Sequence, residues 1–269
     1  MLTPNASHYD RVISAWSLLL GENLHYGYFE TGQETLDEAT AGLTDRMLDR
    51  LGAPARVLDI GCGTGGPAIR AARRFGCGVV GISPSRECVR SARDAVPPDA
   101  AARVDFRLGD AQSLEFEDGS FDAALALESS HLIPDKSLLF SEARRVLRSG
   151  GRFVLCDIVL KVELGMRDVL ARRDDFLLLD RVFGRAKMMT PRGYIEAATR
   201  NGFTVDETAD LTSNTALTFT HWKRNAARYR EEAIGRFGES SWQAFDDSIA
   251  VLQRFWQEGV LGYFMVALK

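Results

Sequence analysis

Two polar side chains follow strands that the sequence predicts to be buried, and their types suit proton transfer. His131 comes shortly after the apolar run Phe121–Glu128, and Asp157 lies near the end of the run Arg152–Leu160. A free histidine, with a pKa of about 6.5, is suited to remove a proton from a hydroxyl or an ammonium group. A buried aspartate needs a partner, so we predict that Asp157 orients His131 or binds a substrate hydroxyl. The alternatives are that His131 is packed under a cap and that Asp157 ties down a neighbouring backbone amide.

A glycine-rich turn follows the first predicted strand. Residues 57–66 read Val-Leu-Asp-Ile-Gly-Cys-Gly-Thr-Gly-Gly, and a helix is predicted to follow at once. Glycines let the backbone approach a ligand closely, and the first amides of a helix face the same ligand. A dinucleotide site would need an acidic residue about 20 residues further on, where residues 81–84 read Gly-Ile-Ser-Pro. The pattern argues against NAD, and a turn that binds nothing is the alternative.

Strands and helices alternate around these residues. The predicted strands are 56–60, 78–83, 104–108, 121–128 and 152–160. The predicted helices between them are 67–75, 85–96 and 134–147, the last of them ended by Gly150-Gly151. Such alternation implies a parallel sheet covered on both faces, which binds ligands at the carboxyl ends of its strands.

The order of elements changes after residue 160. We predict a helix that begins at Thr190-Pro191, where threonine caps and proline fits the first turn. A strand at 203–211, a mostly helical stretch at 213–259 and a terminal strand at 261–269 follow. The terminal strand is expected to be antiparallel, because no further element follows it.

The glycine turn and three later segments occur in the order found in one enzyme family. Residues 59–66, 109–111, 116–122 and 147–153 resemble motifs of the class I, Rossmann-like methyltransferases that use S-adenosylmethionine. The segment Leu-His-Tyr-Gly-Tyr-Phe at 24–29 is similar to natural-product sugar O-methyltransferases and to tocopherol-type methyltransferases. The resemblance implies an α/β fold with a seven-stranded sheet in the order 3-2-1-4-5-7-6. It also implies an antiparallel last strand, helices on both faces and a helical cap.

The resemblance implies a cofactor site for S-adenosylmethionine, which would leave as S-adenosylhomocysteine. Gly61 and Gly63 would approach its methionine part, and Asp59 would lie near its ammonium group or orient the turn. The residues implied for the rest of the molecule are Asp110 and Ala111 at the adenine, Leu127 in the same pocket and Tyr26 as a cover. Most class I members have an acid for the ribose where this chain has Ser83, so the ribose contact would be uncharged.

The catalytic residues implied by the resemblance are His131 and Asp157. Related sugar methyltransferases carry two adjacent histidines at this point, whereas Leu132 follows His131 here. Asp157 matches an aspartate implicated in the same enzymes. We find no acidic cluster of the kind that binds a divalent cation and predict no metal.

The expected organisation has four parts. Residues 1–50 form a helical segment that closes over the cofactor, and residues 51–160 form the core that binds it. Residues 161–189 and 213–259 form a helical cap over the substrate. Residues 190–212 and 260–269 complete the sheet.

The expected function is methylation of a small, bulky and largely apolar natural product on a hydroxyl oxygen, with His131 as the base. The single histidine leaves nitrogen and carbon acceptors open, and Glu128 or aromatic faces would stabilise a carbocation in the last case. A cyclase that keeps the cofactor in place is an alternative, because fold does not dictate reaction. A binding module without catalysis is a further alternative.

The composition sets the remaining expectations. The chain has 269 residues and a formal net charge of −4, so it shows no basic surplus of the kind that nucleic-acid binding needs. We expect no signal peptide and no membrane span. The four cysteines, Cys62, Cys77, Cys88 and Cys156, form no zinc pattern, and we expect them to be reduced thiols in a cytoplasmic protein. Composition does not decide between a monomer and a homo-oligomer.

Overall fold

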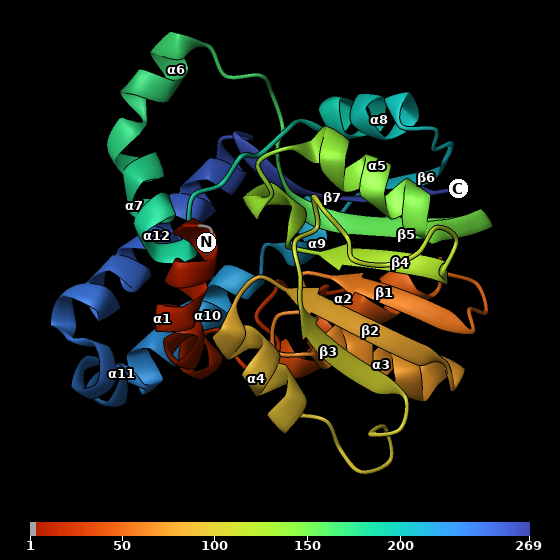
Figure 1. Ribbon diagram of the computed structural model, residues 1–269. Helices are drawn as coiled ribbons and strands as arrows, with labels where there is room; N and C mark the ends of the chain where they lie inside the picture. The colour runs from red at the N-terminus through yellow and green to blue at the C-terminus, as the bar shows by residue number, and fades with distance from the viewer. Residues whose placement is uncertain (1–3) are drawn as a thin grey trace.

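A seven-stranded sheet forms the centre of the molecule in the computed structural model, which describes residues 4–269 (Figure 1). The first three residues of the predicted segment 1–50 lie outside the described range. The strand order is β3-β2-β1-β4-β5-β7-β6, as predicted. The strands are β1 (Arg56–Ile60), β2 (Gly78–Ser83), β3 (Val104–Leu108), β4 (Phe121–Leu127), β5 (Leu147–Leu160), β6 (Val205–Asp210) and β7 (Leu261–Leu268).

Neighbouring strands of the first part of the sheet run parallel. β1 pairs with β2 and β4, β2 with β3 and β4 with β5, all parallel. β7 pairs antiparallel with both β5 and β6, which confirms the expected terminal strand. Every residue of β7 is buried, because helices cover this strand on both faces.

Helices cover both faces of the sheet. On one face α2 (Leu36–Leu48), α3 (Gly66–Phe75) and α4 (Arg86–Asp94) share a core with Val57 and Val79. On the other face α5 (Lys136–Val146) and α8 (Pro191–Arg200) share a core with Leu58 and Val80. Successive residues of β1 and β2 thus face opposite cores, as the geometry of a strand requires.

Six further helices lie at one end of the sheet, on the left in Figure 1. They are α1 (Pro4–Leu19), α6 (Met166–Ala171), α7 (Arg173–Phe183), α10 (Thr218–Arg228), α11 (Arg230–Phe237) and α12 (Glu239–Gln257). The short α9 (Thr212–Thr215) packs against β7. α12 packs against α7, α10 and α11. α6 differs from the others, because none of its residues is buried. None of the helices within residues 4–269 is long and apolar enough to cross a membrane.

Two predicted boundaries around β5 are wrong. We expected Gly150-Gly151 to end a helix, but α5 ends at Val146 and Leu147 is already extended, because it pairs with Phe121. The register shifts before Arg152, so residues 148–151 form an irregularity within the strand, and Gly150 takes a left-handed φ of 74° there. The fourth strand also ends one residue early, at Leu127, because Glu128 has left-handed backbone.

Candidate active site

Two adjoining cavities lie at the carboxyl ends of the parallel strands. Cavity 1, of about 570 Å³, is lined by the turns after β1, β2 and β3. Cavity 2, of about 380 Å³, is lined by the end of β5 and by helices from both ends of the chain. Four residues line both cavities: Tyr9, Glu128, Ala186 and Lys187. The two cavities therefore share a wall that contains these four residues.

The glycine turn brings backbone to the edge of cavity 1. Gly61 has a φ of 84°, and its amide donates to the carbonyl of Ile82 at 2.9 Å. A Cβ at Gly61 would lie 2.2 Å from the Cβ of Ser129, so no side chain fits there. Gly63 has a φ of 51° and would meet nothing within 4 Å, because it faces open space. Both glycines line cavity 1.

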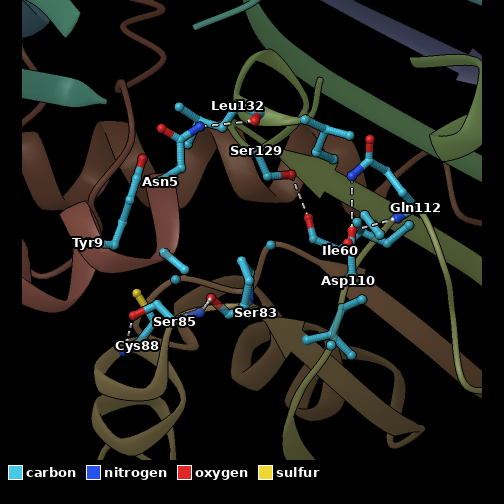
Figure 2. A pocket seen from close by; sticks show the side chains of 18 of the residues that line it. Asn5, Tyr9, Ile60, Ser83, Ser85, Cys88, Asp110, Gln112, Ser129 and Leu132 are labelled. Atoms are coloured by element: carbon cyan, nitrogen blue, oxygen red, sulfur yellow. Dashed lines mark hydrogen bonds between the residues drawn. The ribbon is translucent and has the colours of Figure 1, made fainter. Parts of the chain in front are cut away.

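The turns after β2 and β3 provide the polar groups on the other side of cavity 1 (Figure 2). The hydroxyl of Ser83 accepts a hydrogen bond from the amide of Ser85 at 3.2 Å. Asp110 accepts one from the amide of Gln112 at 2.9 Å, so its carboxyl group is held in a local turn at the exposed rim. Ala111 lines the cavity beside it and is buried. Five predicted cofactor residues thus line this cavity: Gly61, Gly63, Ser83, Asp110 and Ala111.

Asp59 lies buried near the end of β1, just before the glycine turn, and lines neither cavity. Its Oδ2 has no hydrogen-bond partner, and burial raises the pKa of its carboxyl group to about 7. No cation within the described chain offsets this burial. An amino-acid ammonium group would supply the missing positive charge, and the side-chain-free turn above it leaves room for a ligand. These features fit S-adenosylmethionine, with Gly61, Gly63, Ser83, Asp110 and Ala111 around it.

The structure places the other two predicted cofactor residues away from cavity 1. Leu127 is buried and lines neither cavity. Tyr26 lines cavity 2, where its ring stacks on Trp256 with centroids 5.3 Å apart and meets Trp222 at 4.7 Å. The hydroxyl group of Tyr26 is buried without a partner. Tyr26 is thus part of an aromatic cluster on the side of the second ligand.

Glu128 lies at the junction of the two cavities, directly after β4. Its backbone has a φ of 48°, the only left-handed non-glycine residue among those described, and such strain often marks a functional position. The carboxylate accepts a hydrogen bond from the amide of Tyr26 at 2.7 Å and another from the hydroxyl of Tyr263. Burial raises the pKa of Glu128 to about 8, although these two hydrogen bonds act in the opposite direction.

His131 and Asp157 form a hydrogen-bonded pair beside cavity 2. The Nδ1 of His131 lies 2.6 Å from Oδ1 of Asp157, and the amide of His131 donates to Oδ2 at 2.9 Å. Burial would raise the pKa of Asp157. The positive charge that His131 carries when protonated, and hydrogen bonds from His131 and Ser130, hold this pKa below its usual value. An ionised carboxylate only accepts, so Nδ1 of His131 carries the proton. Nε2 is then free to accept one, and His131 lines cavity 2.

A short segment of the chain after α7 holds His131 in place. The amide of Lys187 donates to the carbonyl of His131 at 2.7 Å. The ammonium group of Lys136 donates to the carbonyls of Ile133 and Lys187, at 2.6 and 2.8 Å. Burial lowers the pKa of Lys136 to about 8. The turn that carries His131 is therefore tied to the wall shared by the two cavities.

Cavity 2 is mostly apolar. Its aromatic and aliphatic lining comes from α1, β5, α7, α10 and α12: Trp16, Leu20, Ile158, Leu160, Phe176, Leu179, Phe183, Trp222 and Leu252. Among its charged or titratable residues, Glu128 and Lys187 are shared with cavity 1, whereas His131, Glu163 and Asp180 line cavity 2 alone. The cavity can therefore hold an apolar molecule whose reacting group lies beside His131.

The other histidines lie outside this pair. His25 is buried, with Nδ1 2.8 Å from the carbonyl of Tyr26, and lines neither cavity. His8 contacts the carbonyl of Val182 at 2.9 Å, and His221 stacks on Phe29. The four cysteines are buried and unpaired, as predicted.

Several lining residues could not be identified from the sequence. Tyr9 comes from α1, where no motif surrounds it, and Lys187 comes from the predicted cap. Asn5 donates to the carbonyls of Leu132 and Arg185, at 3.1 Å each, and so ties α1 to the rim of cavity 1. Of these lining residues, only Glu128 could be suspected from the sequence, because it stands at the end of the predicted strand that leads to His131.

Comparison with known proteins gives consistent matches. Residues 58–155 match the family model of a methyltransferase domain. Over 163 residues the chain is 46% identical to 27-O-demethylrifamycin SV methyltransferase of Amycolatopsis mediterranei (strain S699), which covers 59% of this chain and 60% of that protein. It is 30% identical over 211 residues to the O-methyltransferase resE of Aspergillus sclerotiorum, which covers 77% of this chain and 78% of that protein.

A solved structure matches nearly the whole chain. The [4+2]-cyclase SpnF aligns with a TM-score of 0.83 and 27% identity, over 98% of this chain and 94% of that one. The match to the rifamycin enzyme, in contrast, spans less than two thirds of its length. The names of the two relatives describe methyl transfer, whereas the name of the solved structure describes a [4+2] cyclisation.

Proposed function

The chain belongs to the class I S-adenosylmethionine-dependent methyltransferases, and we propose that it methylates a hydroxyl oxygen of a small natural product. The observation that supports this proposal is that the two cavities share a wall. Five of the predicted cofactor residues border cavity 1, and His131, which is paired with Asp157, borders cavity 2. Tyr9 and Glu128 border both, so a donor and an acceptor can meet there.

The residues of cavity 1 would hold the cofactor, which supplies a methyl group on a positively charged sulfur. Gly61 and Gly63 leave space for its amino-acid part, and Asp59 beneath them offers a negative charge. Ser83 binds the ribose and Asp110 the adenine in this proposal. Binding of a cation favours the ionised form of Asp59, whose pKa is about 7 without it.

His131 acts as the general base in this proposal. Its Nε2 accepts the proton of the acceptor hydroxyl as the oxygen attacks, and Nδ1 keeps its hydrogen bond to Asp157. The imidazolium that forms is stabilised by the ionised Asp157, which does not itself take the proton. A positioned base of this kind accelerates a reaction by roughly 10²–10⁴-fold.

The acceptor is a bulky, largely apolar molecule. The walls of cavity 2 are mostly aromatic and aliphatic, with Glu128, His131, Glu163, Asp180 and Lys187 as the charged or titratable exceptions. Apolar walls with a few polar groups are typical of sites for such ligands. The names of the two relatives also describe O-methylation, in one case of a rifamycin. We assign residues 161–189 and 213–259 as the cap over this acceptor and residues 51–160 as the cofactor-binding core.

A second candidate is a reaction at carbon, either C-methylation or cyclisation without methyl transfer. The match to the [4+2]-cyclase SpnF favours it. The buried carboxyl group of Glu128 at the junction would stabilise a carbocation in the first case. The mass of the product separates the candidates, because methylation adds one CH₂ and cyclisation adds nothing.

The proposal is tested in two steps. Titration calorimetry with S-adenosylmethionine is expected to show binding, and no heat at millimolar ligand would contradict cofactor binding. Turnover of a rifamycin-type or other apolar hydroxylated acceptor is expected to fall by roughly 10²–10⁴-fold in His131→Ala, with the cofactor Kd unchanged. His221→Ala is the matched control and keeps full turnover. If His131→Ala does so too, His131 is not the base.

A further inference from the structure

The His131–Asp157 pair continues into a chain of buried hydrogen bonds that leads away from cavity 2. Ser130 donates its hydroxyl proton to Oδ2 of Asp157. The Oγ of Ser130 lies 2.8 Å from the hydroxyl oxygen of Tyr194. Ser130, Asp157 and Tyr194 are all 0% exposed. None of these contacts is required by the glycine turn or by the cofactor cavity.

The donors in this chain follow from chemistry. Ser130 has one hydroxyl proton, and the ionised Asp157 can only accept, so that proton points at Asp157. Tyr194 must therefore be the donor to Ser130. Burial, and after it the charge of Asp157, raises the pKa of Tyr194 well above its usual value, so its proton stays in place.

The carboxylate of Asp157 has no free position. Oδ1 accepts from Nδ1 of His131 at 2.6 Å and from the amide of Ile158 at 2.8 Å. Oδ2 accepts from the amide of His131 at 2.9 Å and from Ser130. The two oxygens, with about four acceptor sites, are thus filled by two backbone amides and two side-chain donors. Ser130 is the one donor with a rotatable hydroxyl, and Tyr194 holds that hydroxyl in its rotamer.

Tyr194 reaches this point from the far side of the sheet. It lies in α8, which begins with Thr190 accepting from the amide of Gly193 at 3.2 Å and with Pro191 in the first turn. Its ring is buried in the core between the sheet and α5. Tyr194 lines neither cavity, so it cannot touch a ligand there.

We propose that Tyr194 is a positioning residue for His131, acting through Ser130 and Asp157. The Tyr194 hydroxyl orients Ser130, Ser130 fixes the carboxylate of Asp157, and Asp157 keeps the proton of His131 on Nδ1. Nε2 then faces the acceptor as the basic nitrogen. The inference rests on the proposed role of His131 as a base.

The test reads the tautomer of His131 and needs no acceptor. Full-length protein with ¹⁵N-labelled histidine is studied by NMR, and His131 is assigned by the loss of its signals in His131→Gln. The wild type is expected to hold the neutral ring with its proton on Nδ1. Tyr194→Phe keeps the ring and removes one hydrogen bond, so the ratio of the Nδ1 to the Nε2 tautomer is expected to fall about 2- to 10-fold.

Two further variants keep the test decisive. Tyr229→Phe is the matched control, because the structure gives its hydroxyl no hydrogen bond, and the tautomer ratio is expected to stay unchanged. Ser130→Ala is expected to lower the ratio at least as much as Tyr194→Phe. The double variant is expected to match Ser130→Ala alone, since Tyr194 acts through Ser130. If Tyr194→Phe does not fold, the tautomer ratio of His131 in Ser130→Ala still tests the proposal.

The outcomes are distinguishable from those of the proposed function. An unchanged tautomer ratio in Tyr194→Phe, even with a lower melting temperature, would mean that Tyr194 only packs, and the inference is overturned. An unchanged ratio in Ser130→Ala overturns it as well. Full turnover in His131→Ala, together with the expected tautomer shift, would remove the base role and leave the positioning chain intact.

Discussion

The two cavities are built in different ways. Cavity 1 is bordered by turns that leave three neighbouring parallel strands, and much of its wall is backbone, as at Gly61 and Gly63. Cavity 2 is bordered by side chains from helices that are far apart in the sequence, such as Trp16, Phe176 and Trp222. The first cavity can keep its ligand when side chains change, whereas the second changes its shape with every substitution. One chain can thus retain a cofactor while its acceptor varies.

Substitution in the glycine turn is expected to have the largest effect and to separate two kinds of glycine. Gly61→Ala combines a left-handed φ with a Cβ 2.2 Å from Ser129, so the free energy of unfolding is expected to fall by about 3 kcal/mol. Gly63→Ala has the left-handed φ alone and is expected to lose about 1 kcal/mol. Chemical denaturation without ligand measures both.

The affinity for the cofactor is the second measurement on the Gly61→Ala and Gly63→Ala variants. The methyl group of Gly63→Ala enters cavity 1, and we expect the Kd for S-adenosylmethionine to rise about tenfold or more. Equal stability of the two variants would show that the contact between Gly61 and Ser129 is not tight. An unchanged Kd in Gly63→Ala would show that the cofactor does not approach this turn.

The effect of pH on stability is expected to be intermediate in size. Burial raises the pKa of Asp59 from 3.8 to about 7. In the pH range between these values the unfolded chain has lost this proton and the folded chain still holds it. The free energy of unfolding therefore falls as pH rises from about 4 to about 7. Between pH 5 and pH 8 we expect Asp59 to contribute a loss on the order of 2 kcal/mol.

The contribution of Asp59 is isolated by comparison with Asp59→Asn. This variant is expected to lose the part of the pH dependence that Asp59 causes, while Glu128, with a pKa of about 8, keeps a slope of the same sign. Asp174→Asn is the control, because that side chain is 96% exposed. Identical pH profiles for wild type and Asp59→Asn would mean that Asp59 is ionised in the free protein.

The smallest effect is expected in the cap. Leu179 is buried and lines cavity 2, whereas Leu170 in α6 is 61% exposed. Leu179→Ala is expected to raise the KM for an apolar acceptor by about fivefold, a loss on the order of 1 kcal/mol of contact. Leu170→Ala is expected to leave it unchanged, and neither variant is expected to change the cofactor Kd. A change in cofactor Kd in Leu179→Ala would break the separation of the two cavities.

The difference between the two cavities also explains which parts of the site could be predicted from the sequence. β1, β2 and β3 have the predicted bounds, because each is short and lies next to turn residues, with apolar and charged residues alternating in β3. The residues that border cavity 1 follow from these strands, since the turn after each strand must lie at one edge of a parallel sheet. His131 and Asp157 could be paired for the same reason, as both lie at ends of neighbouring strands.

The rest of the site depends on packing between distant segments. Tyr9 and Tyr194 come from α1 and α8, and no spacing in the sequence relates either of them to Asp157 or to the cofactor. Tyr26 was predicted at the cofactor, but its stacking on Trp256 places it beside cavity 2. Side-chain contacts of this kind arise only after the helices have docked on the sheet.

The exposed helix α6 makes the stability of the molecule uneven. It has six residues and buries none of them, and one of the six, Val169, lines cavity 2 together with the preceding Leu164. An isolated helix of this length is not stable in water, so its amide hydrogens exchange with solvent through local opening that leaves the sheet intact. The strands under the glycine turn exchange only when the whole core unfolds. We therefore expect large acceptors to enter and leave through local opening of α6, without unfolding of the strands that border cavity 1.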